Sequence, residues 1–314
     1  MKKSLPQMLS EEIGLSPYQF QRLAKRAPDT YKHYVIEKRN GGDRWIAQPA
    51  VETKHIQRWL INNVLSSLPV HQAAMAYKVG SSIALNAELH SKNSYLAKFD
   101  FTNFFNSIKY HNIVNFFTEN FGEIFDKLDI ANMARIVCVR EVGAGLCLSI
   151  GAPSSPLLSN AILYNFDEQV NEWCQKRMMV YTRYADDLTF STNVKGACAD
   201  IDQFLKSILS DLDNPALRLN EKKTVHSSKK FRRQITGLVI NNEGSVSLGR
   251  ERKRNISASI HKFKTGILEG NDLFKLQGLL GFASDVDPKF IVSMNQKYGN
   301  DTLAKIYIIR KPEI

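Results

Sequence analysis

The sequence predicts an α+β fold, because β-hairpin patterns and amphipathic helical patterns are interspersed along its 314 residues. Hairpins are predicted at 31–49 and 180–191, where β-prone arms flank short polar or glycine-rich turns. Apolar residues at helical spacing predict helices within 54–68, 111–137 and 199–212. With 43% hydrophobic residues, the chain can build one large or two modest domains around a substantial core.

Composition limits the class of protein. No apolar run approaches the length of a membrane span, and no apolar stretch follows the two lysines near the N-terminus as it would in a secretory signal. The four cysteines are scattered without a C-x-x-C pair, which argues against zinc binding and a disulfide scaffold. We therefore expect a cytoplasmic protein with reduced thiols and no membrane partner.

Positive charge is concentrated toward the C-terminus. The net charge is +11, and residues 221–314 carry 18 Lys and Arg against 9 Asp and Glu, so nine of the surplus charges lie there. Such an excess is typical of a protein that binds a polyanion. A charged, solvated surface is the alternative; it accounts for isolated lysines but less well for the clusters at 229–233 and 250–254.

The predicted hairpin at 180–191 carries two adjacent carboxylates, Asp186 and Asp187, at its turn. Aspartate is common in such turns, so a solvated turn is one interpretation. The other is a metal site, because paired carboxylates favour a hard cation such as Mg²⁺. A metal site needs a third carboxylate, and Asp100 supplies one at the end of the strand predicted over 95–100. Strand ends are where such sheets place their chemistry.

The remaining segments predict connecting elements. Residues 1–30 predict short helices broken by three prolines, with no chemistry assigned. A helix is expected to begin near Asn106 or Ser107, and another to run from Ser155 as N-cap to about residue 177. The loop before it, 151–156, is rich in small residues and suits close approach by a base pair or phosphate.

After residue 212, a strand is predicted at 217–220 and a second hairpin at 235–248. The segment at 142–149 is predicted to be a hairpin or loop. The last seventy residues are expected to be mostly helical and basic.

Seven motifs together resemble a known family. F-D-F-T-N-F-F (99–105), G-A-P-S-S-P-L-L-S-N (151–160), Y-A-D-D (184–187) and L-N-E-K-K-T (219–224) occur in the order used by the palm of reverse transcriptases. N-A-E-L-H (86–90) and I-T-G (235–237) are similar to boxes of the retron branch, and R-W-I-A-Q-P (44–49) is similar to the family's fingers. The resemblance covers about residues 31–300. One departure is Ile150, where most reverse transcriptases have Gln; the backbone role of the following loop is unaffected.

This resemblance implies a right-hand polymerase with fingers, a palm made of an antiparallel sheet packed on helices, and a mostly helical thumb. The expected divisions are an N-terminal helical segment at 1–30, fingers and palm at 31–230, and a basic RNA-binding thumb at 231–314. The implied activity is RNA-directed DNA polymerisation with two Mg²⁺ ions.

The resemblance also implies roles for individual residues. Asp100, Asp186 and Asp187 are the expected catalytic residues, and with the Phe101 carbonyl they are the expected metal ligands. The residues expected to meet the nucleotide are Lys38, Arg44, Phe105 as the steric gate, Ala152 and Lys223. The residues expected to bind RNA are Asn86, His90, Arg232, Arg233, Thr236, Gly237, Arg250, Arg252, Lys253 and Arg254.

Resemblance to the retron branch implies specific partners. The template and primer is a cognate non-coding RNA, copied with dNTPs from the 2′-OH of an internal guanosine into branched RNA-linked DNA (msDNA). A separate ribonuclease H, an effector protein and a role in antiphage defence are also implied. The alternatives are another bacterial reverse transcriptase, a catalytically idle RNA-binding scaffold and, more distantly, a metal-dependent nuclease.

Overall fold

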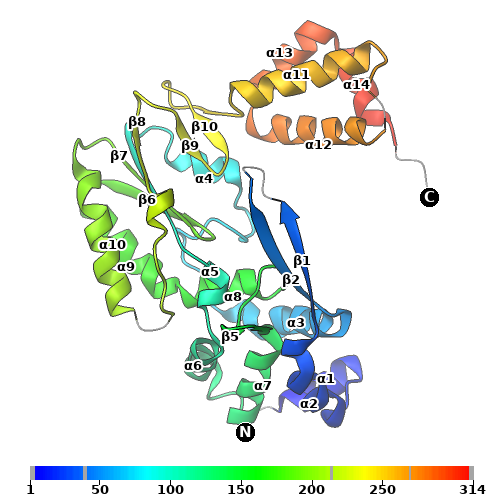
Figure 1. Cartoon of the computed structure of the whole chain (residues 1–314), viewed down its shortest axis with the longest axis vertical. Coiled ribbons are helices and arrows are strands. Elements are labelled where there is room, and N and C mark those ends of the chain that lie inside the picture. The colour runs from blue at the N-terminus through cyan, green and yellow to red at the C-terminus, as the bar shows by residue number, and fades with distance from the viewer. Residues whose placement is uncertain (1–3, 38–40, 213–214, 269, 311–314) are drawn as a thin grey trace.

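The computed structural model describes residues 4–37, 41–212, 215–268 and 270–310. Helices and antiparallel sheets are arranged in three parts: a central sheet, a helical lobe at one end and a separate helical bundle formed by the C-terminal residues (Figure 1). The predicted α+β class is confirmed. None of the helices in the described ranges combines the length and apolar character needed to cross a bilayer.

The helical lobe is formed by five helices from the first 137 residues. Its helices share one hydrophobic core, so residues 4–30 pack with the following elements instead of forming a separate unit. Two of the three prolines lie in the first turn of a helix, where a missing N–H costs little, so they start helices instead of breaking them. The members are α1 (Leu5–Ile13), α2 (Pro17–Arg26), α3 (Val51–Asn63), α6 (Tyr110–Phe121) and α7 (Lys127–Val137).

A long hairpin, β1 (Tyr31–Glu37) and β2 (Asp43–Pro49), extends from this lobe toward the C-terminal bundle, as Figure 1 shows. It corresponds to the hairpin predicted over 31–49. A second, short hairpin, β4 (Val139–Glu141) and β5 (Gly145–Cys147), resolves the hairpin-or-loop alternative in favour of a hairpin.

The central sheet has the strand order β6-β7-β3-β8 and is antiparallel throughout. Its bounds are β3 (Tyr95–Asp100), β6 (Met179–Tyr184), β7 (Asp187–Thr192) and β8 (Val225–Ser228). One face packs on α9 (Tyr164–Gln175) and α10 (Ile201–Asp211) through Phe99, Leu188 and Phe190. Side chains alternate between the faces of a strand, so Asp100 and Asp187 point to the opposite face.

Several predicted boundaries are corrected. The helix expected from residue 111 to 137 is two helices, α6 and α7. The helix expected after the 151–156 loop is also two, α8 (Ser155–Ile162) and α9, with Ser154 rather than Ser155 as the N-cap. Near Asn106 there is only the four-residue α5 (Phe104–Ser107), and α6 begins at Tyr110 because Asn112 accepts the Lys109 N–H.

The strand predicted at 217–220 is reduced to one bridge between Leu219 and Phe101. Alternating leucines there suggested a strand, but Leu217 packs into the core behind the sheet, and β8 pairs with β3 at the edge instead.

The C-terminal part joins a small sheet to a helical bundle. The sheet has the order β11-β10-β9, made of β9 (Arg233–Ile235), β10 (Leu238–Ile240) and β11 (Val246–Ser247). It packs with α4 (Ile83–Leu89) and with the bundle in a second hydrophobic core. The bundle contains α11 (Arg250–Lys264), α12 (Asn271–Val286), α13 (Pro288–Tyr298) and α14 (Asn300–Ile308), as expected for the last seventy residues.

Candidate active site

Three carboxylates lie at one end of the central sheet. Asp100, the last residue of β3, is directly opposite Asp187, the first residue of β7. Directly opposed residues of antiparallel strands point to the same face, with Cβ atoms about 5 Å apart. Asp186 lies in the two-residue turn between β6 and β7, and its carbonyl accepts the Phe101 N–H at 3.0 Å. The structure therefore brings together the three aspartates that the sequence analysis singled out.

Lys223 joins this group from the turn before β8. Its Nζ donates to both carboxylate oxygens of Asp100, at 2.9 and 2.8 Å. Asp100 is 5% exposed, so the ammonium compensates a nearly buried negative charge. Burial opposes the charge of Lys223, but the hydrogen bond and attraction to Asp100 outweigh it and raise the lysine pKa.

The other two carboxylates have raised pKa values. Burial, followed by repulsion from Asp100, raises the pKa of Asp186, while the charges of Lys223 and Arg44 act in the opposite direction. Burial raises the pKa of Asp187 to about 6, opposed by Lys98 and reinforced by the other two aspartates. The carboxylates thus lie near enough to repel one another. The nearby positive charges do not offset the combined effect of burial and repulsion, so both pKa values stay raised.

The donor set fits a hard divalent cation. In the described part of the chain, no group of three His, Cys, Asp or Glu side chains is arranged to hold a metal ion as it stands. The carboxylate oxygens are nevertheless the ligands that Mg²⁺ prefers, and Lys223 lies against Asp100 where a cation would be favourable. The mutual repulsion of these carboxylates is the condition that a bound cation relieves.

Replacement of Asp187 with Asn is expected to stabilise the metal-free protein at high pH. The pKa of Asp187 is about 6 in the folded protein against an ordinary 3.8, so its ionisation is less favourable in the folded state. The free energy of unfolding therefore falls as the pH rises from about 4 to 6. The full loss, at most about 3 kcal/mol for a shift of this size, is present above pH 6 and absent below pH 4. Asn removes this ionisation.

Thermal unfolding in EDTA measures the effect. At pH 8 the Asp187→Asn protein should melt several degrees above the wild type, and at pH 4 the two should melt together. Added Mg²⁺ should raise the melting temperature of the wild type more than that of the variant. Equal melting temperatures at pH 8 without metal would remove the ionisation cost assigned to Asp187.

A pocket of about 440 Å³ is connected to this group through Tyr77, although none of the three aspartates lines it. It is lined by Phe105 of α5, by Ala152 and its neighbours in the 151–156 loop, and by Tyr77. The charge of Asp186 contributes to the raised pKa of Tyr77, after burial, which indicates that this phenol lies near the turn that bears Asp186. Phe105 and Ala152, both expected at the nucleotide, therefore line one cavity.

The loop at 151–156 is held against β2 by backbone contacts. The Ile150 carbonyl accepts the Ala47 N–H at 2.9 Å, and Ser149 Oγ donates to the Ala47 carbonyl at 3.2 Å. Gly151 has a φ of +119°, and a Cβ there would lie 2.9 Å from Ile46 Cγ2. Only glycine fits both the backbone angle and the close packing. Ile150 thus contributes its backbone to holding the loop, and it is one of the residues that line the pocket.

Sequence reasoning missed three pocket residues. Lys54 and Arg58 of α3 line the pocket, although the helix was interpreted only as core. They are one turn apart, and this i, i+4 basic pair was the available signal. Tyr77, whose side chain is partly enclosed by the site and still 57% exposed, has an unusual φ of +61° and was also not assigned a role. Strained, exposed aromatic residues next to a cavity are frequently functional.

Of the two fingers cations expected at the nucleotide, Arg44 is on β2, and its charge lowers the pKa values of both Asp186 and Tyr77. Its charge therefore acts on the group that contains Asp186 and Tyr77. Lys38 lies outside the described residues.

The residues expected to bind RNA divide into three groups. Arg232, Gly237, Arg250 and Arg254 are exposed. Arg252 and Lys253 are partly buried and have partners within the bundle: Arg252 stacks on Phe282, and Lys253 forms a 2.7 Å ion pair with Asp287. Thr236 is partly buried at the tight β9–β10 turn, where its Oγ1 donates to the Ile83 carbonyl.

Asn86, His90 and Arg233 do not fit the RNA-binding expectation as placed. All three are buried. The ring nitrogens of His90 lie 2.7 Å from Ser191 Oγ and 2.8 Å from Thr182 Oγ1, and burial lowers its pKa to about 3. It is a neutral structural histidine on the polar face of the sheet.

Arg233 is likewise structural, because its guanidinium donates to the carbonyls of Asn93 and Asn241. The contact with Asn93 ties the small sheet of β9–β11 to the segment that leads into β3 of the central sheet.

The antiparallel sheet that ends in three carboxylates beside a basic and aromatic pocket is that of a polymerase palm. Residues 36–240 match the family described as reverse transcriptase (RNA-dependent DNA polymerase). The chain is 39% identical to the retron Ec83 reverse transcriptase of Escherichia coli, with 91% of this chain and 93% of that protein covered. It is 36% identical to the retron Ec73 reverse transcriptase of Escherichia coli, with 87% and 88% covered.

The chain belongs to the reverse transcriptase family and, within it, to the retron reverse transcriptases. It is therefore an RNA-directed DNA polymerase of a retron with a right-hand fold. Among solved structures, an apo telomerase of Candida tropicalis, truncated from its C-terminal domain, aligns with a TM-score of 0.46 and 17% identity over 76% of this chain and 60% of that one.

Proposed function

We propose that this enzyme copies a cognate non-coding RNA, priming from the 2′-OH of an internal guanosine, and makes branched RNA-linked DNA. The observation that carries the proposal is the convergence of Asp100, Asp186 and Asp187 beside the pocket lined by Phe105, in a chain that aligns with retron reverse transcriptases over nearly its whole length. The alternative of an idle scaffold does not account for three intact carboxylates.

In this proposal Asp100 and Asp186 hold two Mg²⁺ ions, with Asp187 and the Phe101 carbonyl assisting. Bound Mg²⁺ supplies stabilisation of the attacking and leaving oxygens in phosphoryl transfer. Lys223 would then move from Asp100 toward the triphosphate, since the metal takes over compensation of the carboxylate. Arg44, and Lys38 by the family pattern, bind the same triphosphate from the fingers.

The exposed cations of the C-terminal part support binding of a folded RNA. Arg232, Arg250 and Arg254 present charge to solvent, and RNA helices are recognised largely through phosphates and 2′-hydroxyls. A separate ribonuclease H for template removal, an effector protein, a cytoplasmic location and a role in antiphage defence complete the proposal. These points are what the resemblance to the retron branch implies.

Priming is tested with synthetic RNA. Nucleic acid that co-purifies with the protein is sequenced to define the RNA, which is then made with guanosine or 2′-deoxyguanosine at the branch position. We expect Mg²⁺-dependent synthesis of DNA joined to the first RNA and none on the second, while an annealed DNA primer is extended on both. Equal unprimed synthesis on both RNAs would contradict 2′-OH priming and leave general polymerase activity intact.

A further inference from the structure

The turn formed by Ala185 and Asp186 between β6 and β7 is called the catalytic turn below. Behind it, on the helix-covered face of the sheet, lies an ion pair shielded completely from solvent. We infer that its arginine, Arg183, is a positioning residue that holds the turn bearing Asp186 in register with one wall of the nucleotide pocket. The inference rests on the proposed roles of Asp186 and Asp187. It assigns Arg183 no contact with substrate.

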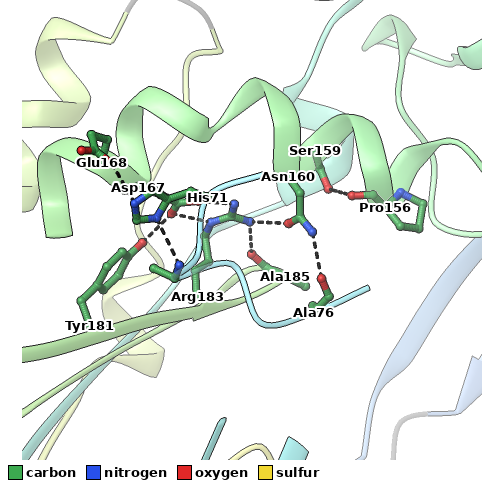
Figure 2. Close-up of polar contacts among 11 residues, drawn as sticks. His71, Ala76, Pro156, Ser159, Asn160, Asp167, Glu168, Tyr181, Arg183 and Ala185 are labelled. Atoms are coloured by element: carbon green, nitrogen blue, oxygen red, sulfur yellow. Dashed lines mark hydrogen bonds and ion pairs between the residues drawn. The ribbon is translucent and has the colours of Figure 1, made fainter. Parts of the chain in front are cut away.

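Arg183 is the penultimate residue of β6, two positions before Ala185. Its side chain and that of Asp167 on α9 are both 0% exposed. The guanidinium makes a two-pronged contact with the Asp167 carboxylate, Nε to Oδ1 at 2.8 Å and Nη2 to Oδ2 at 2.6 Å. Tyr181 donates to the same carboxylate at 2.8 Å. Figure 2 shows these side chains converging between β6 and the helix above it.

The remaining guanidinium nitrogen contacts the catalytic turn directly. Nη1 donates to the Ala185 carbonyl at 3.2 Å and to Asn160 Oδ1 at 3.1 Å. Ala185 has a φ of +58°, a left-handed conformation that a non-glycine residue adopts only where its surroundings impose it. The Ala185 carbonyl belongs to the peptide that leads into Asp186. Arg183 thus holds that peptide at the point where the backbone is strained.

The same arginine also holds the segment before Tyr77. Its backbone N–H donates to the Ala73 carbonyl and its carbonyl accepts the Met75 N–H, both at 2.7 Å. Asn160, which accepts from Arg183, donates to the Ala76 carbonyl at 2.8 Å (Figure 2).

A further contact lies between His71 and Glu168, at 2.8 Å. One buried cluster therefore fixes both the turn carrying Asp186 and the chain that presents Tyr77 to the pocket.

Arg183→Lys tests the inference. Lysine keeps the positive charge opposite Asp167, but its single nitrogen cannot also donate hydrogen bonds to the Ala185 carbonyl and to Asn160. A displacement of about 1 Å at a reacting group lowers rates by as much as about a hundredfold. We expect kcat per active site to fall about ten- to a hundredfold, with the KM for dNTP changed less than about threefold. Active sites are counted by burst titration, so loss of folded protein does not enter kcat.

Two further variants separate positioning from stability. Arg233→Lys alters a second buried arginine, whose carbonyl contacts do not lead to the catalytic turn. It should lower the melting temperature while kcat per active site stays within about twofold. Asn160→Ala keeps the pair of Arg183 and Asp167 but releases Ala76, and should raise the KM for dNTP several-fold with a smaller loss of kcat.

The inference is overturned if Arg183→Lys keeps wild-type kcat per active site, or if Arg233→Lys loses as much. Should the lysine variant not fold, an unchanged KM in Asn160→Ala overturns the link to the pocket wall. Failure of the proposed catalytic roles is a separate outcome, because full activity of Asp186→Asn would show it while leaving the Arg183 measurements unaffected.

Discussion

Replacing Asp186 with Asn is expected to abolish DNA synthesis while RNA binding persists. The substitution keeps the shape of the side chain and removes the charge that a divalent cation needs at the centre of the site. Loss of several kcal/mol of transition-state stabilisation lowers the rate by at least about a thousandfold. RNA affinity should change less than about twofold, because the exposed cations of the C-terminal part lie elsewhere.

Primer extension on an RNA template with Mg²⁺ measures the first quantity, and filter binding of the same RNA measures the second. Asp202→Asn is a matched control, since Asp202 is on α10 behind the same sheet and forms an ion pair with the surface Lys206. It should retain wild-type synthesis. Extension by Asp186→Asn at the wild-type rate would refute the metal assignment.

Replacing Phe105 with Ala is expected to admit ribonucleotides. The ring is partly buried and packs against Phe104 with centroids 5.2 Å apart, which limits its movement in the pocket it shares with Ala152. An aromatic ring held in this way occupies the space that a ribose 2′-OH requires. Removing it should raise the rNTP/dNTP ratio of kcat/KM roughly tenfold or more, while dNTP incorporation falls less.

Single-nucleotide extension with paired dNTP and rNTP measures this ratio. Phe105→Val should give an intermediate value, because its side chain leaves part of the space filled. Phe116→Ala is the control: it removes a partly buried ring from the helical lobe, and should lower stability without altering selectivity. An unchanged ratio in Phe105→Ala would assign the gate to another residue, with Tyr77 the first to examine.

Local sequence patterns predicted most helices and strands, but not the positions where one helix ends and the next begins. The hairpin at 180–191 was predicted because its β-prone arms and polar turn are local signals. The division of the predicted helix at 111–137 was not, because the apolar spacing continues through Phe125, which packs into the same core as the two helices. The prediction of a strand at 217–220 was wrong for a related reason. Alternating apolar and polar residues indicate which side chains are buried, whether or not a neighbouring strand is free to pair.

The sequence predicted where along the chain the positive charge is concentrated, but not which of the polar side chains expected to bind RNA are exposed. The C-terminal surplus is a property of composition, and Arg250 and Arg254 are exposed as expected. Arg233, in an equally basic cluster, is buried, and its hydrogen bonds go to the carbonyl of the distant Asn93 and to that of Asn241, eight residues further along. His90 is enclosed by hydroxyls of β6 and β7 that are about a hundred residues away in sequence.

The sequence by itself determined which side chains can do chemistry. Asp100, Asp186 and Asp187 follow from strand ends and a turn that are encoded locally, and the motif order around them identifies the polymerase. Only the tertiary structure decided which residues support them. Arg183 is one residue before Y-A-D-D, yet its partners Asp167 and Asn160 lie on separate helices, and a buried ion pair forms only where packing excludes water from both charges at once.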